Sequence, residues 1–433
     1  MGATIDALEW RTMKHRPFLS ATFVALAIGA LASSAGTAHA QRIEFPTLAR
    51  AIELARARAI VVADANGELG VAKAQMAGAR VSSFGNPYVE VQVDKGFAGP
   101  KTADFQVQAL GFAYFPVDLG GQRGARIEEA DRLIKWRELG VNDARGIATG
   151  EAVSAYGEVL VAGARIVEAK NGEQTARDEA KYFAGRLEAK DTTVYEKSLA
   201  DAEVARWVQS RGEAQLRSLS GRARFAQVTG SLDIDPPAAT VAVAPPQLSA
   251  SWDDAFVGRI VDKTPIVARL TAERVYWDSS AERYKTERFP PVALELIGGR
   301  GELGETRLGG GVVLTLPITR RYQGEITRAE QGRMSAVNRL TLYRTIVEAR
   351  LRAARDAVVT VSKTVEELDQ TGMPALEKAV SSSVEGFKLG KIEITRVLLA
   401  RRDLALARAR RLDLIEAGWR AYADLTVLSG DLP

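Results

Sequence analysis

The chain contains one long segment twice, at a spacing of 200 positions. Residues 190–230 align with residues 390–430 without a gap, and further upstream residues 115–117 (FPV) recur as residues 316–318 (LPI). A duplication of this length indicates that one structural unit is used twice within the chain. The two halves should therefore share one order of helices and strands, and this constrains the fold more than any other feature.

The first forty residues have the pattern of an export signal peptide, which we predict at residues 1–40. A basic start at residues 14–16 precedes an apolar run at residues 18–31 that is too short for a stop-transfer helix. Residues 38–40 (AHA) form a small-x-small cleavage site. Met13 would begin a signal of ordinary length, so the true start of the protein could be Met13. An N-terminal membrane anchor is the alternative interpretation.

Removal of this signal would leave a mature chain without imidazole or thiol groups. The sequence has two histidines, His15 and His39, both inside the predicted signal, and no cysteine. This excludes Ser-His-Asp and Cys-His catalysis, haem histidine ligation, iron–sulfur clusters, disulfides and the usual zinc sites. Carboxylate chemistry and oxygen-ligated metals remain open, but adjacent acids such as Glu128 and Glu129 diverge in direction on a helix and indicate a solvated face. We therefore expect no enzyme, no catalytic or metal-binding residue and no cofactor.

Residues 88–94 (YVEVQVD) alternate strictly between apolar and polar side chains. The three valines would lie on one face of a strand, and Glu90, Gln92 and Asp94 on the other. Period-two alternation with one fully polar face is typical of a β-strand. A second two-faced strand should end at Pro116, and a weaker pair of strands recurs in the second half.

After each strand pair the sequence favours helix over a long distance. About 70 residues up to Ala189 would span roughly 100 Å at 1.5 Å per residue. The return run is about half as long, so an opening helix at residues 47–81 would have to stack end to end with it. The predicted first repeat covers residues 41–232, with strands at about 87–97 and 103–116 and a helical hairpin at about 118–230; the second covers residues 251–433, with strands at about 291–299 and 308–317 and a hairpin at about 320–430; residues 233–250 link them.

Four strands cannot close a barrel by themselves, and an open sheet edge is not tolerated within a membrane. Yet the predicted strands are about ten residues long and two-faced, as in outer-membrane barrels. Three copies would supply about twelve strands, a number within the range of such barrels, and the helices would close into a tube in the same way. We therefore predict a mainly α fold with a small β part: a trimeric 12-stranded outer-membrane β-barrel continued by a periplasmic α-helical barrel.

Three further patterns indicate structure rather than chemistry. Residues 299–304 match G-x-G-x-x-G, but a second strand rather than a helix should follow, so a glycine-rich surface loop is preferred over a nucleotide site. The 58 Lys and Arg residues are nearly balanced by 54 Asp and Glu residues, so we expect no nucleic-acid partner. We expect packing between helices for Trp207, Trp252, Trp277 and Trp419.

Five segments of the sequence are informative together. They are FPVDLGGQRGARI (115–127), LPITRRYQGEITRA (316–329), RLEAKDTTVYEKSLADAEVA (186–205), FKLGKIEITRVLLARRDLALA (387–407) and YADLTVLSG (422–430). In this order they resemble the TolC-like outer-membrane efflux proteins, also called outer membrane factors, and the resemblance covers nearly the whole predicted mature chain. The arginine-rich form without a lipidated cysteine looks most like the branch that serves cobalt–zinc–cadmium-type cation efflux.

The resemblance implies a passive exit duct in the outer membrane of a Gram-negative cell, with most of the chain in the periplasm. Such a homotrimer contacts outer-membrane lipid, docks a periplasmic adaptor (membrane fusion) protein and an inner-membrane efflux pump, and exports small molecules or metal cations. Two alternatives are a periplasmic coiled-coil scaffold without a pore and the duct of a type I protein secretion system. A soluble scaffold has no use for two-faced strands of membrane-spanning length, which favours a duct.

The predicted adaptor-docking residues lie at the two hairpin turns, the points farthest from the barrel. The first turn has Lys190 where the family prefers glycine, whereas the second turn keeps Gly390. The predicted docking residues are Ala189, Lys190, Asp191 and Thr192 in the first turn and Leu389, Gly390, Lys391 and Ile392 in the second.

The predicted gate lies just beyond these turns. Glu196 and Arg396 are repeat equivalents, and in a closed trimer they would form a ring of alternating charge, with about 0.2–1 kcal/mol for each exposed pair. We predict a gate of Glu196, Arg396 and Leu399. Many family members carry aspartates at the positions of Arg396 and Leu399, so a cation-binding aspartate ring is not expected here. The alternative is that Arg396 pairs within its own helix, for instance with Glu393.

Overall fold

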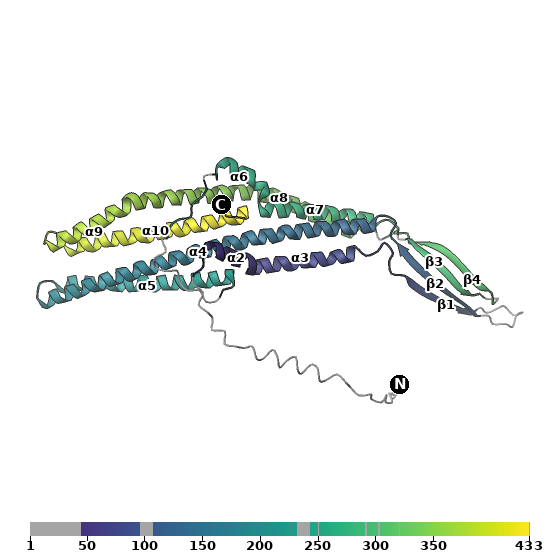
Figure 1. Ribbon diagram of the computed structural model, residues 1–433, viewed down its shortest axis with the longest axis horizontal. Helices are drawn as coiled ribbons and strands as arrows, with labels where there is room; N and C mark the ends of the chain where they lie inside the picture. Colours follow the sequence, from purple (N-terminus) through teal and green to yellow (C-terminus); the bar gives the residue numbers. More distant parts are fainter. Residues whose placement is uncertain are drawn as a thin grey trace, which may run out of the picture. The chain divides into compact units, whose positions relative to one another are not determined.

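The computed structural model describes most of the chain beyond the predicted signal peptide (Figure 1). The predicted signal peptide with its alternative start at Met13, most of the predicted linker and the first residues of the predicted second strand lie outside the described residues. Within the described ranges the chain is mainly helical with one four-stranded sheet, as predicted. These ranges are 45–95, 107–231, 243–249, 251–290, 292–301, 304–319 and 321–432.

The first repeat has two opening helices where the sequence predicts one. They are α2 (Leu48–Arg58) and α3 (Ile60–Ala79), and the residue between them, Ala59, is extended, with φ −60° and ψ 137°. Ala59 is also buried, so the core remains packed at the residue where the helix is interrupted. The long hairpin follows as α4 (Gln122–Glu188) and α5 (Val194–Thr229).

The second repeat divides its long hairpin into more pieces than the first. Over the described residues, none of the helices is both long enough and apolar enough to cross a membrane. The helices of this repeat are α6 (Asp254–Ile260), the 3-10 turn η1 (Val261–Lys263), α7 (Pro265–Thr286), α8 (Gln323–Glu367), the π-helix η2 (Leu368–Gly372), α9 (Met373–Lys388) and α10 (Ile394–Ser429).

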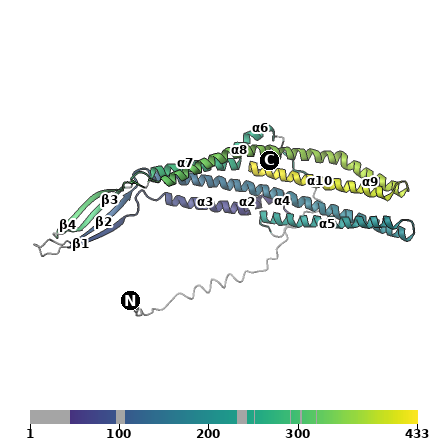
Figure 2. The same ribbon diagram turned by 180° about the vertical axis from the view of Figure 1, so that it is seen from behind.

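The long helix α4 contacts helices of both repeats. It packs against α5, α10, α7 and α3. Figures 1 and 2 show α3, α2 and α5 following one another along α4, which is the end-to-end arrangement that the helix lengths require. In both views the sheet lies at one end of these helices and the two hairpin turns lie at the other. The strands of both repeats therefore lie at one end of the helices, and the hairpin turns of both repeats lie at the other.

The sheet joins the two repeats through its central strands. Its order is β1-β2-β3-β4, and all neighbours are antiparallel. The register of β2 on β3 places Ala113 opposite Leu296. Within the described residues the outer edges of β1 and β4 have no strand partner. The strands are β1 (Tyr88–Lys95), β2 (Val107–Val117), β3 (Val292–Arg300) and β4 (Thr306–Leu314).

The two faces of the sheet differ in polarity, as the alternation of β1 predicts. The register aligns Val91 with Gly111, Gly298 and Leu308 in one row across the four strands. Side chains alternate between the two faces of a strand, so every second row lies on the same face as this one. The rows on this face carry only a few polar residues. The opposite face is mixed, because the register aligns Glu90 with Phe112 and Ile297 and aligns Gln92 with Leu110; it also carries Asp94 and Glu295. Exposed apolar residues on the first face are Val89, Val91, Val93, Leu294, Leu296, Leu308, Val312 and Leu314.

Trp419 and Trp207 pack over glycines of a neighbouring helix, which is the role predicted for them. A Cβ atom on Gly157 would lie 2.4 Å from both Cβ and Cγ of Trp419. The same arrangement recurs between Gly172 and Trp207, where a Cβ would lie 2.5 Å from the indole. The glycines therefore let α4 approach α10 and α5 more closely than any side chain would allow.

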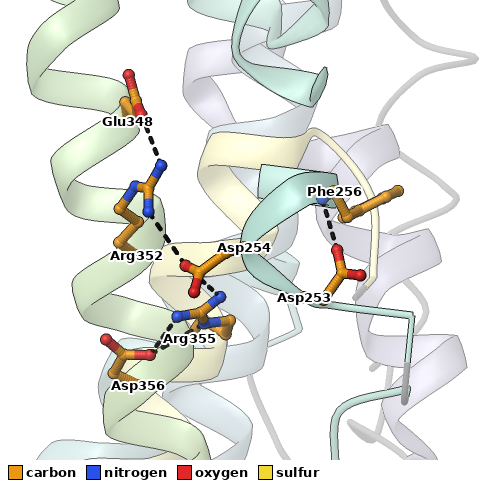
Figure 3. Close-up of polar contacts among 7 residues, drawn as sticks. All are labelled: Asp253, Asp254, Phe256, Glu348, Arg352, Arg355 and Asp356. Atoms are coloured by element: carbon orange, nitrogen blue, oxygen red, sulfur yellow. Dashed lines mark hydrogen bonds and ion pairs between the residues drawn. The ribbon is translucent and has the colours of Figure 1, made fainter. Parts of the chain in front are cut away.

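The short helix α6 is held against α8 by a cluster of ion pairs (Figure 3). Asp253 caps α6 by accepting a hydrogen bond of 2.6 Å from the backbone N–H of Phe256. Asp254 accepts hydrogen bonds from two arginines of α8, at 3.1 Å from Arg352 and 2.9 Å from Arg355. Asp254 thus supplies one carboxylate to two cations, which fixes the start of α6 on the surface of α8.

Candidate functional site: the two hairpin turns

The two hairpin turns have the same backbone structure, although one has lysine where the other has glycine. In the first turn the N–H of Lys190 donates to the carbonyl of Leu187 at 3.0 Å, and the N–H of Asp191 donates to that of Arg186 at 2.8 Å. The second turn repeats both bonds, from Gly390 and Lys391, at 2.9 Å each. These are the two hydrogen bonds of the Schellman motif, which ends a helix with a left-handed residue.

The left-handed residue of each turn is Lys190 (φ 60°) or Gly390 (φ 69°). A lysine in this conformation is strained by about 1–2 kcal/mol, whereas glycine is not, although glycine loses more entropy on folding. We expect Lys190→Gly to raise the unfolding free energy by about 0.5–1 kcal/mol, measured as slower amide exchange in residues 186–197. Lys391→Gly, one position beyond the left-handed residue, is the control and should show no gain. Equal effects of the two substitutions would contradict this account.

The predicted docking residues are largely accessible. Ala189, Lys190 and Asp191 are exposed, and so are Leu389, Gly390 and Lys391. Thr192 and Ile392 are half-buried in corresponding positions, and Ile392 lies over Gly386, where a Cβ would meet it at 2.6 Å. The structure therefore gives each turn three exposed residues followed by one that packs back onto its own hairpin.

The two hairpins pack against each other just beyond their turns. Phe183 of α4, Ala200 of α5 and the α10 residues Ile394 and Val397 form one buried cluster. The ring centroids of Phe183 and of Phe387 on α9 lie 6.0 Å apart. This cluster holds the two turns of one chain together as a single unit.

Glu196 is engaged within its own turn. Its carboxylate accepts hydrogen bonds from the Thr192 hydroxyl and, at 3.2 Å, from the backbone N–H of Thr193. The Thr193 hydroxyl in turn accepts from the backbone N–H of Glu196 at 3.2 Å, which completes a capping box at the start of α5. The hydrogen bonds from Thr192 and Thr193 lower the pKa of Glu196, so this carboxylate stays ionised at neutral pH.

Arg396 and Leu399 face away from the core of their own chain. Both side chains are exposed, and the backbone N–H of Arg396 donates to the carbonyl of Glu393 at 3.1 Å. Among the described residues Arg396 has no ion pair, either with Glu196 or with Glu393. The ring of alternating charge joins different copies of the chain, so it stays a prediction.

The sequence analysis missed a π-helix in the second hairpin. At η2 the helix widens between α8 and α9, immediately before Pro374. A proline within a helix removes one backbone donor and crowds the preceding turn, and local widening relieves that conflict. Arg411 of α10 binds both carboxylate oxygens of Asp369 in η2, at 2.5 and 2.6 Å. The sequence feature that could have predicted this π-helix is Pro374, which lies within an otherwise helical sequence.

The arrangement offers no resident metal site in the part of the chain that the structure describes. No group of three or more His, Asp or Glu side chains is arranged to hold an ion there. The described residues instead present two exposed turns, the ionised carboxylate of Glu196, the exposed guanidinium of Arg396 and, at the other end, a two-faced sheet with open edges.

The chain matches a curated protein over most of its length. It is 25% identical over 399 residues to the cobalt-zinc-cadmium resistance protein CzcC of Cupriavidus metallidurans, and the match covers 89% of this chain and 90% of that protein. No family model matches the chain.

Solved structures show the same fold. The structure of CusC, described in terms of transmembrane channel formation, matches with a TM-score of 0.72 at 13% identity and covers 89% of this chain and 92% of CusC. The CmeC outer membrane channel of Campylobacter jejuni matches with a TM-score of 0.72 at 15% identity, over 89% and 86% of the two chains. The predicted resemblance to TolC-like outer-membrane proteins is therefore confirmed at the level of the fold.

Proposed function

We propose that this chain, which has the TolC-like outer-membrane channel fold, is the passive exit duct of a tripartite efflux system. The observation that carries the proposal is the sheet. It has one apolar face, an opposite face that holds its carboxylates, and two open edges, and its strands continue into long helical hairpins. Such a sheet cannot be stable in a membrane as a single copy, because its edge N–H and C=O groups would lack partners.

Closure by three copies satisfies both edges of every sheet. The edge strand β1 of one copy would pair with β4 of the next, which gives a barrel of about twelve strands with the face that holds the carboxylates inside. The barrel lies in the outer membrane and the helices cross the periplasm toward the inner-membrane pump. No catalytic step is part of this proposal.

Divalent metal cations are the cargo that the comparisons favour. CzcC is named for resistance to cobalt, zinc and cadmium, and it matches this chain over nearly its full length.

A periplasmic scaffold without a pore would not need the apolar sheet face. The duct of a type I protein secretion system has the same requirements for the sheet, so cargo must be decided by export assays.

The adaptor should dock on the two hairpin turns, and a bulky residue at Gly390 tests this site. Gly390 is exposed and no atom lies within 4 Å of its Cβ position, so the added side chain would project outward. We expect Gly390→Trp to abolish adaptor cross-linking and metal resistance while the trimer and its membrane insertion persist.

Gly390→Ala is the matched control for this experiment. It introduces the same backbone strain at φ 69° without the bulk of an indole. The alanine variant should retain most of the cross-linking. Normal cross-linking of the Trp variant would exclude the turn as the contact, and equal loss in both variants would indicate a backbone effect.

Charge reversal at Arg396 tests the proposed gate between copies. Like charges would face each other in the Arg396→Glu trimer, so we expect a leaky duct with a several-fold higher single-channel conductance at low salt. Adding Glu196→Arg should restore closure in part, because it restores opposite charges but removes the capping box. Glu196→Gln separates the two roles, since glutamine keeps the capping box and loses the charge. Wild-type conductance of Arg396→Glu would exclude the charge ring.

A further inference from the structure

Among the described residues, each of the four connections between sheet and helices exposes at least one arginine and at least one large apolar side chain at or beside it. The apolar side chains are far from buried: Phe84 is 62% exposed, Leu119 64% and Ile318 73%. All four arginines are exposed as well. The pairs are Arg80 with Phe84 before β1, Leu119 with Arg123 after β2, Arg288 with Phe289 before β3, and Ile318 with Arg321 after β4. We call these eight residues the junction collar.

Two hydrogen bonds link the four connections two by two. The Nε–H of Arg123 donates to the carbonyl of Val81 at 3.2 Å, which ties the connection before β1 to the one after β2. Arg288 donates in the same way to the carbonyl of Arg321 at 3.1 Å, which ties the connection before β3 to the one after β4. The four connections thus form two linked pairs.

A close contact joins these two pairs. A Cβ atom on Gly120, after β2, would lie 2.5 Å from Cγ of Phe289, before β3. The four connections therefore form one continuous band across the end of the sheet. Each arginine of this band keeps N–H donors beyond those used here, because a guanidinium carries five.

The junction collar is positively charged, and no described carboxylate forms an ion pair with any of its four arginines. The carboxylates nearby are already paired: Asp118 binds Arg126 at 2.5 Å, and Glu287 lies 3.5 Å from the same Arg126. A band of guanidinium groups among exposed apolar side chains suits a surface with anionic headgroups beside an apolar phase.

We propose that the junction collar binds the phosphate groups of anionic phospholipids in the periplasmic leaflet of the outer membrane. This inference rests on the proposed function, which puts the apolar face of the sheet in that membrane. The apolar members enter the acyl boundary and the arginines donate to headgroup phosphates, whose geometry matches the guanidinium fork. Three copies of the chain would close the collar into a ring around the barrel.

Lipid retention by the purified full-length protein tests the proposal. The trimer is equilibrated in micelles that contain phosphatidylcholine and phosphatidylglycerol in equal amounts, and co-purifying lipids are counted by mass spectrometry. We expect the wild type to enrich phosphatidylglycerol about fivefold or more at low salt, and to lose the enrichment at 1 M NaCl. The quadruple variant Arg80→Gln, Arg123→Gln, Arg288→Gln and Arg321→Gln should bring the ratio close to one.

A second quadruple variant controls for total charge. Arg217, Arg259, Arg402 and Arg410 are also exposed, none of them forms an ion pair with a described residue, and they lie on α5, α6 and α10. Their replacement by glutamine should leave the enrichment unchanged. Equal enrichment in the wild type and the collar variant, or equal loss in both quadruple variants, would overturn the proposal.

A single variant guards against loss of folding. Arg80 makes no side-chain hydrogen bond within the described residues, so Arg80→Gln should leave the fold intact and lower the enrichment about twofold. No change in this variant would exclude Arg80 from the lipid contact. Insertion into neutral vesicles is measured in parallel. If the wild type inserts but shows no lipid preference, the collar proposal fails alone; if it does not insert at all, the proposed function fails.

Discussion

Gly157→Ala is expected to lower the unfolding free energy of the protein by about 2–3 kcal/mol, although only one methyl group is added. The new Cβ would lie 2.4 Å from Cβ and Cγ of Trp419, close to the backbone of α10. Trp419 cannot turn aside freely, because its Nε1–H donates to the carbonyl of Ala244 at 3.1 Å and its ring lies 5.9 Å from that of Tyr156. Either α10 moves away from α4 or the indole leaves its place.

Gly185→Ala is the matched control, since Gly185 lies on the same helix with nothing within 4 Å of its Cβ position. Alanine favours helix over glycine, so this variant should gain about 0.5–1 kcal/mol. Thermal midpoints are compared at one protein concentration, because the proposed assembly is oligomeric. Combining Gly157→Ala with Trp419→Ala should remove the penalty of the added methyl group. Similar shifts for Gly157→Ala and Gly185→Ala would contradict the close packing of α4 on α10.

Val91→Arg is expected to prevent stable insertion of the barrel, whereas Gln92→Arg is expected to be tolerated. The two residues are neighbours on β1, but Val91 lies on the apolar face and Gln92 on the opposite face. An arginine on the lipid side of a barrel costs about 2–4 kcal/mol near the membrane centre, and a trimer would carry it three times.

The readout for this pair is the fraction of folded trimer recovered from outer membranes. We expect at least a tenfold loss for Val91→Arg and nearly wild-type recovery for Gln92→Arg. Equal recovery of both variants would show that the apolar face does not contact lipid. Loss of both would indicate that β1 tolerates no charge for reasons of strand pairing, because β1 is an edge strand that must meet another copy.

Local patterns in the sequence predicted the sheet well. The alternation of Val89, Val91 and Val93 with polar residues identified both β1 and its apolar face, because side-chain direction in a strand depends only on position along it. The duplication then supplied the second strand pair. Which strands join the repeats was not readable, since the pairing of β2 with β3 links residues almost 200 positions apart.

Features that depend on tertiary packing escaped the sequence analysis. The break between α2 and α3 has no proline or glycine at Ala59, which is extended and buried in the folded chain, so no local signal marks it. The π-helix could have been suspected from Pro374, but its ion pair with Arg411 could not. The capping box was readable, because Thr193 precedes Glu196 by three residues. That motif gives Glu196 a local role besides the predicted gate.

The mass of the purified protein in detergent tests the central claim most directly. The account rests on a four-stranded sheet whose edges β1 and β4 find partners only in other copies of the chain. Light scattering with correction for bound detergent should give three times the mass of a single chain, and the protein should aggregate when detergent is removed. A monodisperse monomer that stays in solution without detergent would contradict the account.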